Sequence, residues 1–408
     1  MIVDRIPVVD ADSHLTERAG VWVDRMPAKY LDIAPRIVTS PSGREVWLIG
    51  DKMVQGAAAT SAAGGAEYWP DYPMTLAEVD PAAYDATARA ARLDEYGIRA
   101  QVLYPNLLAF NLFELFQVGD EPFRLACMQA YNDYLTEFAA EAPGRFVPIA
   151  VLPFWDVDAT VREIERVHEA GHGGLLFANA PEMVGLPPLR DRHWDPVYAA
   201  AEERHLSLNF HIGFGGFDST LGVSAFPSRS RRNSVEGMEE LAQFRADLSK
   251  VSTLGLISNS RAIVEVLVSG ICDRFPGLNF VSVESGFGYV PYLLEALDWQ
   301  WLNNGAREAF SDRMMPSEYF KRQVYATFWF EGPTVTRFID DYADNVMFES
   351  DFPHPTSLSP GPVSHTDSPD KVIEANLSEL SDEILTKILH GNAERIYNLE
   401  PAVAAPRP

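Results

Sequence analysis

Cysteine is nearly absent from this chain of 408 residues, which contains only Cys127 and Cys272. Two cysteines cannot build a disulfide framework or a thiolate metal cluster. The sequence also lacks an uninterrupted apolar run of roughly 18 residues, the length that a transmembrane helix needs, and its first residues lack the basic and then apolar order of a signal peptide. We therefore expect a soluble, cytoplasmic protein with no membrane partner.

Basic residues are scarce relative to acidic ones. The chain has 33 Lys and Arg against 58 Asp and Glu, which gives a formal net charge of −25. A surface of this sign repels phosphate backbones and anionic lipid, so we expect no nucleic-acid partner. The same surface means that an anionic substrate needs a local cation or a metal ion to bind.

The chain has ample material for a core, with 47 % hydrophobic residues, and its length suits one large α/β domain with insertions or two ordinary domains. Apolar segments that favour strands alternate with amphipathic segments that favour helices. The eight expected strands are 7–12, 98–104, 146–152, 174–178, 206–211, 278–284, 324–327 and 346–351. Eight strands with intervening helices predict a distorted (β/α)8 TIM barrel, which we expect to form a single domain over residues 1–408.

Two segments do not fit the alternation and are expected to be insertions in the barrel. The first covers about 20–80 and contains a predicted β-hairpin over 37–49, with a turn of Pro, Ser and Gly at 40–43, followed by a small-residue loop at 56–66. The second follows the fifth strand, at about 213–259, and is expected to form a loop and a helix over the site.

Four apolar segments far apart in the chain end in residues that bind divalent metals. Asp12 and His14 end the first, His211 the second, Glu284 the third and Asp351 the fourth. The active sites of parallel barrels lie at the carboxyl ends of their strands, so these side chains are expected to converge. Each alone has a simpler explanation, such as an exposed polar pair, a core histidine or a helix cap. Together they predict a metal site.

Five blocks of the sequence resemble the amidohydrolase-2 family, a group that includes metal-dependent decarboxylases. They are VVDADSH, FHIGFG, VESGFGYVPYLLEALD, FESDFPHP and HGNAERIY. The likeness runs from Val8 to about Leu399. It implies a barrel with one divalent metal ion per chain, zinc first and manganese or iron as alternatives, held by Asp12, His14, His211 and Asp351. It also implies a homo-oligomer, either a dimer or a tetramer.

The sequence departs from the family pattern at informative positions. Asp12 stands where the family has a longer Glu or His, and Glu284 stands where its decarboxylases have a proton-transferring His. The lysine that bridges two metals in other branches has no counterpart in the run 173–177, which favours one metal. Glu284 and His354 are therefore candidate proton-transfer residues beside Asp351, although Glu284 could instead pair with Arg261 and only hold the rim together.

Three functions remain open on these residues. The family resemblance favours non-oxidative decarboxylation of a small aromatic or ring-cleavage carboxylate. The first alternative is hydrolysis of a C–C bond, lactone or amide with Glu284 as general base, and the second is a non-catalytic binding protein on the same barrel. Candidate substrate-binding residues are Arg229, Arg231 and Arg232, which would recruit a carboxylate, and the aromatic Trp329.

Overall fold

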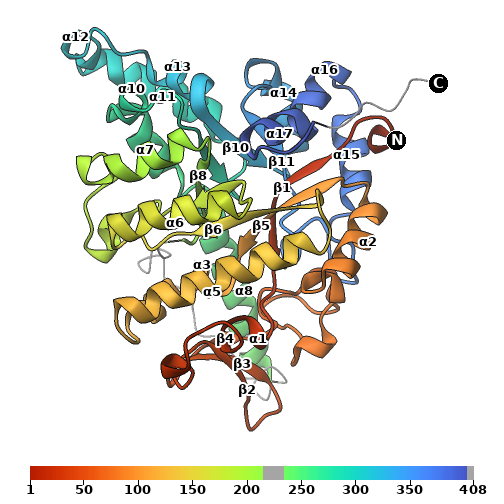
Figure 1. Ribbon diagram of the computed structural model, residues 1–408. Coiled ribbons are helices and arrows are strands. Elements are labelled where there is room, and N and C mark those ends of the chain that lie inside the picture. The colour runs from red at the N-terminus through yellow and green to blue at the C-terminus, as the bar shows by residue number, and fades with distance from the viewer. Residues whose placement is uncertain (215–233, 402–408) are drawn as a thin grey trace.

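The computed structural model describes residues 1–214 and 234–401. Its main feature is a sheet of eight parallel strands, ordered β1-β5-β6-β7-β8-β9-β10-β11 (Figure 1). The strands are β1 (Val9–Leu15), β5 (Ala100–Pro105), β6 (Phe146–Val151), β7 (Gly174–Leu176), β8 (Ser207–His211), β9 (Phe280–Val283), β10 (Val324–Phe328) and β11 (Val346–Phe348). The bounds of six strands lie within two residues of the expected segments, whereas β1 continues three residues further than expected and β11 ends three residues earlier. The predicted barrel is confirmed.

The barrel closes between its first and last strands. Ser13 forms an isolated parallel bridge with Phe352, the His14 amide donates to the Phe352 carbonyl at 2.7 Å, and the Asp351 amide donates to the Asp12 carbonyl at 3.0 Å. The buried Asp10 carboxylate strengthens the same seam by accepting a hydrogen bond from the Ser350 amide at 2.8 Å. The seam therefore places Asp12 and His14 beside Asp351.

Helices surround the strands, and Figure 1 shows α2, α5, α6 and α7 on the outside of the barrel. The helices of eight or more residues are α2 (Ala86–Tyr96), α5 (Glu121–Ala140), α6 (Val157–Glu169), α7 (Asp195–Glu203), α8 (Val235–Leu256), α9 (Ser260–Val268), α11 (Val290–Asn303), α13 (Pro316–Gln323) and α15 (Pro369–Leu377). The shorter ones are α1 (Gly20–Val23), α3 (Leu107–Phe110), α4 (Leu112–Phe116), α10 (Ile271–Arg274), α12 (Ala306–Ala309), α14 (Gly332–Phe338), α16 (Asp382–Thr386) and α17 (Asn392–Ile396). A π-helical turn over Lys387–Gly391 joins the last two.

The first insertion contains the predicted hairpin, extended by a third strand. Strands β2 (Arg36–Thr39), β3 (Glu45–Ile49) and β4 (Lys52–Gly56) form an antiparallel sheet. Sequence reasoning missed β4 because Lys52 and Met53 are both exposed, so the strand lacks an alternating apolar pattern. The sheet packs against the barrel through Trp47, whose ring meets the Trp22 ring edge-on at 5.2 Å.

The second insertion contains the helix α8, as expected, and the part at 215–233 lies outside the described residues. The stretch Val235–Val268 is long and apolar enough to cross a membrane by length and composition alone, with a mean hydropathy of 1.3 in its most apolar window. The structure breaks this stretch at 257–259 into α8 and α9. Helix α9 buries Ala262, Ile263, Val266 and Leu267 in the protein core, which accounts for its apolar character.

Candidate metal centre

Strand β1 supplies the first two residues of the predicted site. All seven of its residues are buried, and its pairing with β5 shifts register between Asp10 and Ser13. Such an irregularity bends a strand and re-aims its side chains. Asp12 and His14 are completely buried. The alternative explanation, an exposed polar pair, is therefore wrong.

The other predicted residues follow or end their strands. His211 is the last residue of β8, Glu284 follows β9 directly, and Asp351 lies three residues after β11. Glu284 and Asp351 adopt left-handed backbone conformations, with φ of 53° and 59°. Residues other than glycine pay a conformational cost there, and such strain clusters at functional sites.

These side chains converge on one small volume. The Nε2 atoms of His14 and His211 are 3.0 Å apart, and His211 Nε2 is 3.4 Å from Glu284 Oε2. Asp12 Oδ1 is 3.7 Å from His14 Nε2, and Asp12 Oδ2 is 3.7 Å from His211 Nε2. Asp351 Oδ1 is 3.6 Å from His14 Nε2. The sequence prediction that the four strand ends meet agrees with this geometry.

His354 joins the same volume, which gives six residues that we call the metal-site cluster. Its ring stacks on the His14 ring with centroids 3.8 Å apart. Two overlapping sets of ligand atoms each lie within 4.8 Å of one another, and both contain His14 and Glu284. The first adds Asp12 and His211, and the second adds Asp351 and His354.

The imidazole rings of His14 on β1 and His211 on β8 have the orientation that is usual for metal-binding histidines. His14 Nδ1 lies 3.2 Å from the Pro105 carbonyl, and His211 Nδ1 lies 2.7 Å from the Ile212 carbonyl. A carbonyl oxygen only accepts, so Nδ1 carries the proton in both rings and the Nε2 lone pairs face each other. Burial lowers the pKa of both rings, that of His211 to about 3, which keeps them neutral.

Four carboxylate oxygens of the cluster lack donors. Both oxygens of Asp12, Oε2 of Glu284 and Oδ1 of Asp351 are buried without a hydrogen-bond partner. Burial, followed by repulsion from the other carboxylates, raises the pKa of Asp12 and Glu284 well above the ordinary range. Converging lone pairs and unpaired carboxylate oxygens need a cation to be stable together. The residues present therefore fit one divalent metal ion.

Sequence reasoning missed several residues around the cluster. Glu349 is fully buried behind Glu284, whose amide donates weakly to it at 3.4 Å, and Asp10 is buried at the seam. Phe110 covers the rings of His14, His211 and His354 at centroid distances of 5.7–6.1 Å. Asn106 follows β5 directly and contacts His354. An asparagine directly after an apolar strand is a sequence signal comparable with the His, Asp and Glu residues that predicted the site.

The predicted substrate-binding residues do not join this cluster in the described structure. Arg229, Arg231 and Arg232 lie outside the described residues. Trp329 is only 4 % exposed and lines a narrow space in the helix layer with residues of α14 and α15. Arg261 pairs with Glu182, so the alternative in which it pairs with Glu284 is wrong.

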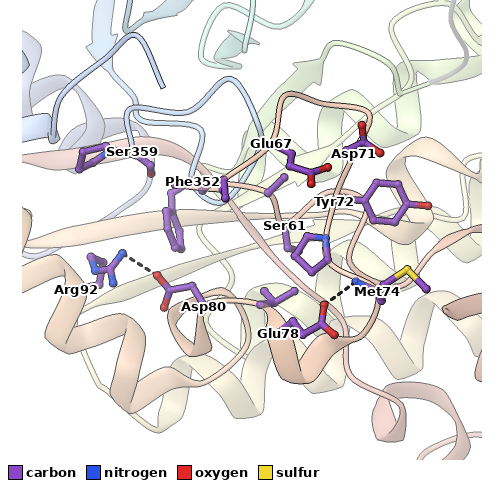
Figure 2. A pocket seen from close by; sticks show the side chains of 18 of the residues that line it. Ser61, Glu67, Asp71, Tyr72, Met74, Glu78, Asp80, Arg92, Phe352 and Ser359 are labelled. Carbon is purple, nitrogen blue, oxygen red and sulfur yellow. Dashed lines mark hydrogen bonds and ion pairs between the residues drawn. The ribbon is translucent and has the colours of Figure 1, made fainter. Parts of the chain in front are cut away.

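Two cavities lie near the cluster. One of about 640 Å³ lies between α2 and the loop at 61–80, with Glu67, Asp71, Glu78 and Asp80 among its lining residues (Figure 2). Arg92 in the same wall is paired with Asp80, at 2.8 Å. Phe352 also lines this cavity, but none of the six cluster residues does. This cavity is therefore a neighbour of the metal centre and not its mouth.

The second cavity, of about 280 Å³, is also lined by none of the six cluster residues, but one of its lining residues bonds to the cluster. It is lined by Trp69, by Arg245 of α8 and by Thr356, among others. The Thr356 hydroxyl donates to Asp351 Oδ2 at 3.2 Å, so a single hydrogen bond separates this lining from a cluster carboxylate. The Arg245 guanidinium lies over the Tyr68 ring, 5.2 Å from its centroid.

Comparison with known proteins agrees with this architecture. The γ-resorcylate decarboxylase of Rhizobium sp. (strain MTP-10005) is 22 % identical over 346 residues, which is 82 % of this chain and 92 % of the relative. A solved amidohydrolase from Mycobacterium avium subsp. paratuberculosis K-10 matches with a TM-score of 0.71 and 21 % identity, covering 96 % of this chain and 99 % of the other. The 5-carboxyvanillate decarboxylase of Novosphingobium aromaticivorans DSM 12444, solved with manganese, matches with a TM-score of 0.60 and 18 % identity, covering 97 % and 96 %.

Family membership follows from the whole chain, and not from any one of these relatives. The model of the family described as amidohydrolase (Amidohydro_2) matches residues 9–399. That range includes all eight barrel strands and all six residues of the metal-site cluster. The chain belongs to the amidohydrolase family.

Proposed function

We propose that this protein is a metal-dependent decarboxylase of a small aromatic or ring-cleavage carboxylate. The observation that carries the proposal is the convergence of two neutral imidazoles and unpaired carboxylates at the carboxyl ends of the barrel strands. The activity named for the γ-resorcylate relative supports the choice of reaction. Catalysis at this end of the strands is the rule for the fold.

The metal would be held by His14 and His211 together with carboxylates of the cluster. When bound, a divalent ion acts as a Lewis acid on the substrate carboxylate and an adjacent oxygen. Zinc, which the sequence favoured, and manganese, which the solved carboxyvanillate decarboxylase contains, both accept imidazole and carboxylate ligands. Elemental analysis of the dialysed protein decides between them.

Glu284 is the residue that we assign to proton transfer. Its Oε2 atom has no hydrogen-bond partner, and Glu284 belongs to both sets of residues that could hold the metal, so its carboxylate is available to a substrate there. As the acid, Glu284 would give its proton to the ring carbon that bears the carboxylate. The bond between that carbon and the carboxylate then breaks, carbon dioxide leaves, and Glu284 regains a proton from solvent.

Substrate access is proposed through the cavity beside α8. Trp69 and Tyr68 offer aromatic walls there, and Arg245 offers the positive charge that an anionic substrate needs on a chain of net charge −25. Phe110 would then cover the ring of the substrate at the cluster. Arg229, Arg231 and Arg232, which precede α8 in the sequence and lie outside the described residues, remain proposed substrate-binding residues.

Hydrolysis with Glu284 as general base is the second candidate, and a specific observation favours it. The position holds a carboxylate, and a nearby cation opposes the effect of burial and keeps a carboxylate ionised. An ionised Glu284 would accept a proton from water instead of donating one. The two candidates therefore differ in the protonation state of one residue.

The test is a panel of aromatic carboxylates supplied to metal-loaded protein in water enriched in oxygen-18. Release of carbon dioxide without label in the aromatic product supports decarboxylation. Label in a new carboxylate or hydroxyl supports hydrolysis. Protein that retains no metal and does not bind added zinc or manganese contradicts both enzymes and leaves the binding-protein alternative.

A further inference from the structure

The three histidines of the metal-site cluster share one arrangement. Each directs one ring nitrogen to an acceptor outside the cluster and the other to the carboxylates inside it. For His14 and His211 the outer acceptor is a backbone carbonyl, whereas for His354 it is Oδ1 of Asn106, 2.7 Å from Nε2. Metal-binding histidines usually donate their second nitrogen to a carbonyl or carboxylate in this manner.

The orientation of the Asn106 amide fixes the tautomer of His354. The Asn106 Nδ2 group donates to the Leu15 carbonyl at 3.3 Å, and this carbonyl cannot donate in return. The amide oxygen must therefore face His354, and an oxygen there requires a proton on Nε2. The remaining nitrogen, Nδ1, is the one that faces the cluster.

His354 Nδ1 has no ordinary partner inside the cluster. It lies 2.7 Å from Asp351 Oδ1, yet that oxygen has no donor directed at it, so the close approach is not a hydrogen bond. Asp351 and His354 also share a set of ligand atoms with His14 and Glu284, all within 4.8 Å of one another. A lone pair and a carboxylate oxygen this close together are stabilised by a cation beside both.

Asn106 is itself held in place by buried groups. Its backbone amide donates to Glu17 Oε1 at 3.0 Å, and the amide of Leu107 donates to the same oxygen at 2.8 Å. Asn106 is completely buried and Glu17 is 1 % exposed. These bonds fix the chain where β5 ends, so Asn106 presents its side chain to His354 from a rigid support.

We propose that His354 is a third imidazole ligand of the metal ion, through Nδ1, and that Asn106 is the positioning residue that makes this nitrogen available. The inference rests on the metal-dependent function proposed above. It assigns His354 to metal binding instead of the proton transfer that the sequence suggested. The three histidines would then bind from three separate places, namely β1, β8 and the segment after β11.

The experiment is a titration of metal-free protein, labelled with nitrogen-15 in its histidine rings, with zinc chloride. The chain has nine histidines, and all lie within the described residues. We expect the Nε2 resonances of His14 and His211 and the Nδ1 resonance of His354 to shift on binding, with the other rings unchanged. The wild-type titration needs no substitution, so a variant that fails to fold does not affect it.

Variants then test the role of Asn106. His354→Gln should remove the third shifting ring and weaken zinc binding at least tenfold. Asn106→Leu should weaken zinc binding about 10–100-fold and convert part of the metal-free His354 ring to the tautomer protonated on Nδ1. Asn106→Asp, which keeps an acceptor oxygen, should restore most of the affinity. His172→Gln is the control, because His172 is also buried but bonds to Thr136 far from the cluster.

Two results would overturn the inference and differ from failure of the proposed function. If only two rings shift, or if His354 is doubly protonated with and without zinc, His354 is not a ligand, although a metal enzyme can still operate with two histidines. If no ring shifts, the metal site itself is absent, and the proposed function fails with the inference. Three shifting rings support the inference whatever reaction the protein catalyses.

Discussion

At the scale of single residues, the metal-site cluster is costly to fold without its ion. Two neutral histidines face each other at 3.0 Å, and four carboxylate oxygens of Asp12, Glu284 and Asp351 have no donor. Unsatisfied buried polar groups each cost about 1–3 kcal/mol, and more when they are charged. A protein that buries such destabilising groups together uses them for a function, which here is metal binding.

We first predict that substitutions of the metal ligands remove the metal ion from the protein, whereas a substitution of the proton-transfer residue leaves it bound. His211→Ala and Asp351→Asn should each lose the metal and turnover together. Glu284→Gln should keep about one ion per chain, because the amide oxygen still accepts, while kcat falls roughly 100-fold or more through loss of the proton. Metal analysis and steady-state kinetics on the same samples check this. A fully active Glu284→Gln protein would remove Glu284 from the mechanism.

A second prediction concerns Glu17, which supports Asn106. Burial raises the pKa of its carboxyl from 4.5 to about 7. Between these values the folded state holds a proton that the unfolded state has released, so the contribution of Glu17 to stability decreases as the pH rises from 4.5 to 7.

Glu17→Gln should therefore gain stability relative to the wild type as the pH rises, by up to about 3 kcal/mol between pH 4 and pH 8. Urea unfolding of both proteins at several pH values measures the difference. A difference that stays constant with pH would show that folding does not raise the pKa of Glu17.

At the scale of elements, the strands were easier to predict than the groups around their ends. Each barrel strand is a short buried apolar run, and such a run is visible in the sequence whatever its neighbours. Asn106 instead looks like an ordinary cap for the short helix α3, and its contact with His354 depends on the fold. Asp10 and Glu349 were missed for the same reason, because only the closed barrel buries them. Strand β4 was missed because only Gly56 of its five residues is buried, so no apolar alternation marks it.

One buried aromatic contact joins the small β2–β3–β4 sheet to helix α1, which carries Trp22. Trp47 is 1 % exposed and packs on Trp22, whose indole donates to the Cys127 carbonyl of α5 at 3.0 Å. Helix α5 in turn packs against β6, which anchors the contact to the barrel. Trp47 of the sheet is therefore connected to barrel strand β6 through Trp22 and helix α5.

Our third prediction is that Trp47→Ala destabilises the protein by about 3–5 kcal/mol, as large-to-small substitutions of buried aromatics do. Trp47→Phe should cost much less because it keeps a ring against Trp22. Denaturant unfolding gives the free energies, and limited proteolysis should cut the variant first within residues 36–56. Equal stability of the alanine variant and the wild type would mean that other contacts hold the sheet.

At the scale of the whole molecule, charge controls how a substrate arrives. The net charge of −25 creates a negative potential around a site that is proposed to take an anion. Salt screens such repulsion, with a Debye length of roughly 10 Å at 0.1 M. The approach of the substrate is therefore expected to be faster in salt.

We accordingly predict that kcat/KM for an aromatic carboxylate rises with ionic strength, whereas kcat at saturation stays nearly constant. The measurement is a series of initial rates from about 0.02 to 0.3 M sodium chloride, a range over which the screening length falls several-fold. Arg245→Gln should lower kcat/KM at every salt concentration, while Arg307→Gln, at an exposed position in α12, serves as the charge-matched control. A kcat/KM that falls with salt would show that local positive charge dominates the approach.

The bridge between Ser13 and Phe352 also determines when the site can exist during synthesis. The ligands of β1 leave the ribosome long before Asp351 and His354, which follow them by more than 300 residues in the sequence. Until both are free, the barrel cannot close and the nascent chain cannot enclose an ion. Metal acquisition is thus a late step, completed after translation has passed the eighth strand, and any chain terminated before that point lacks the site altogether.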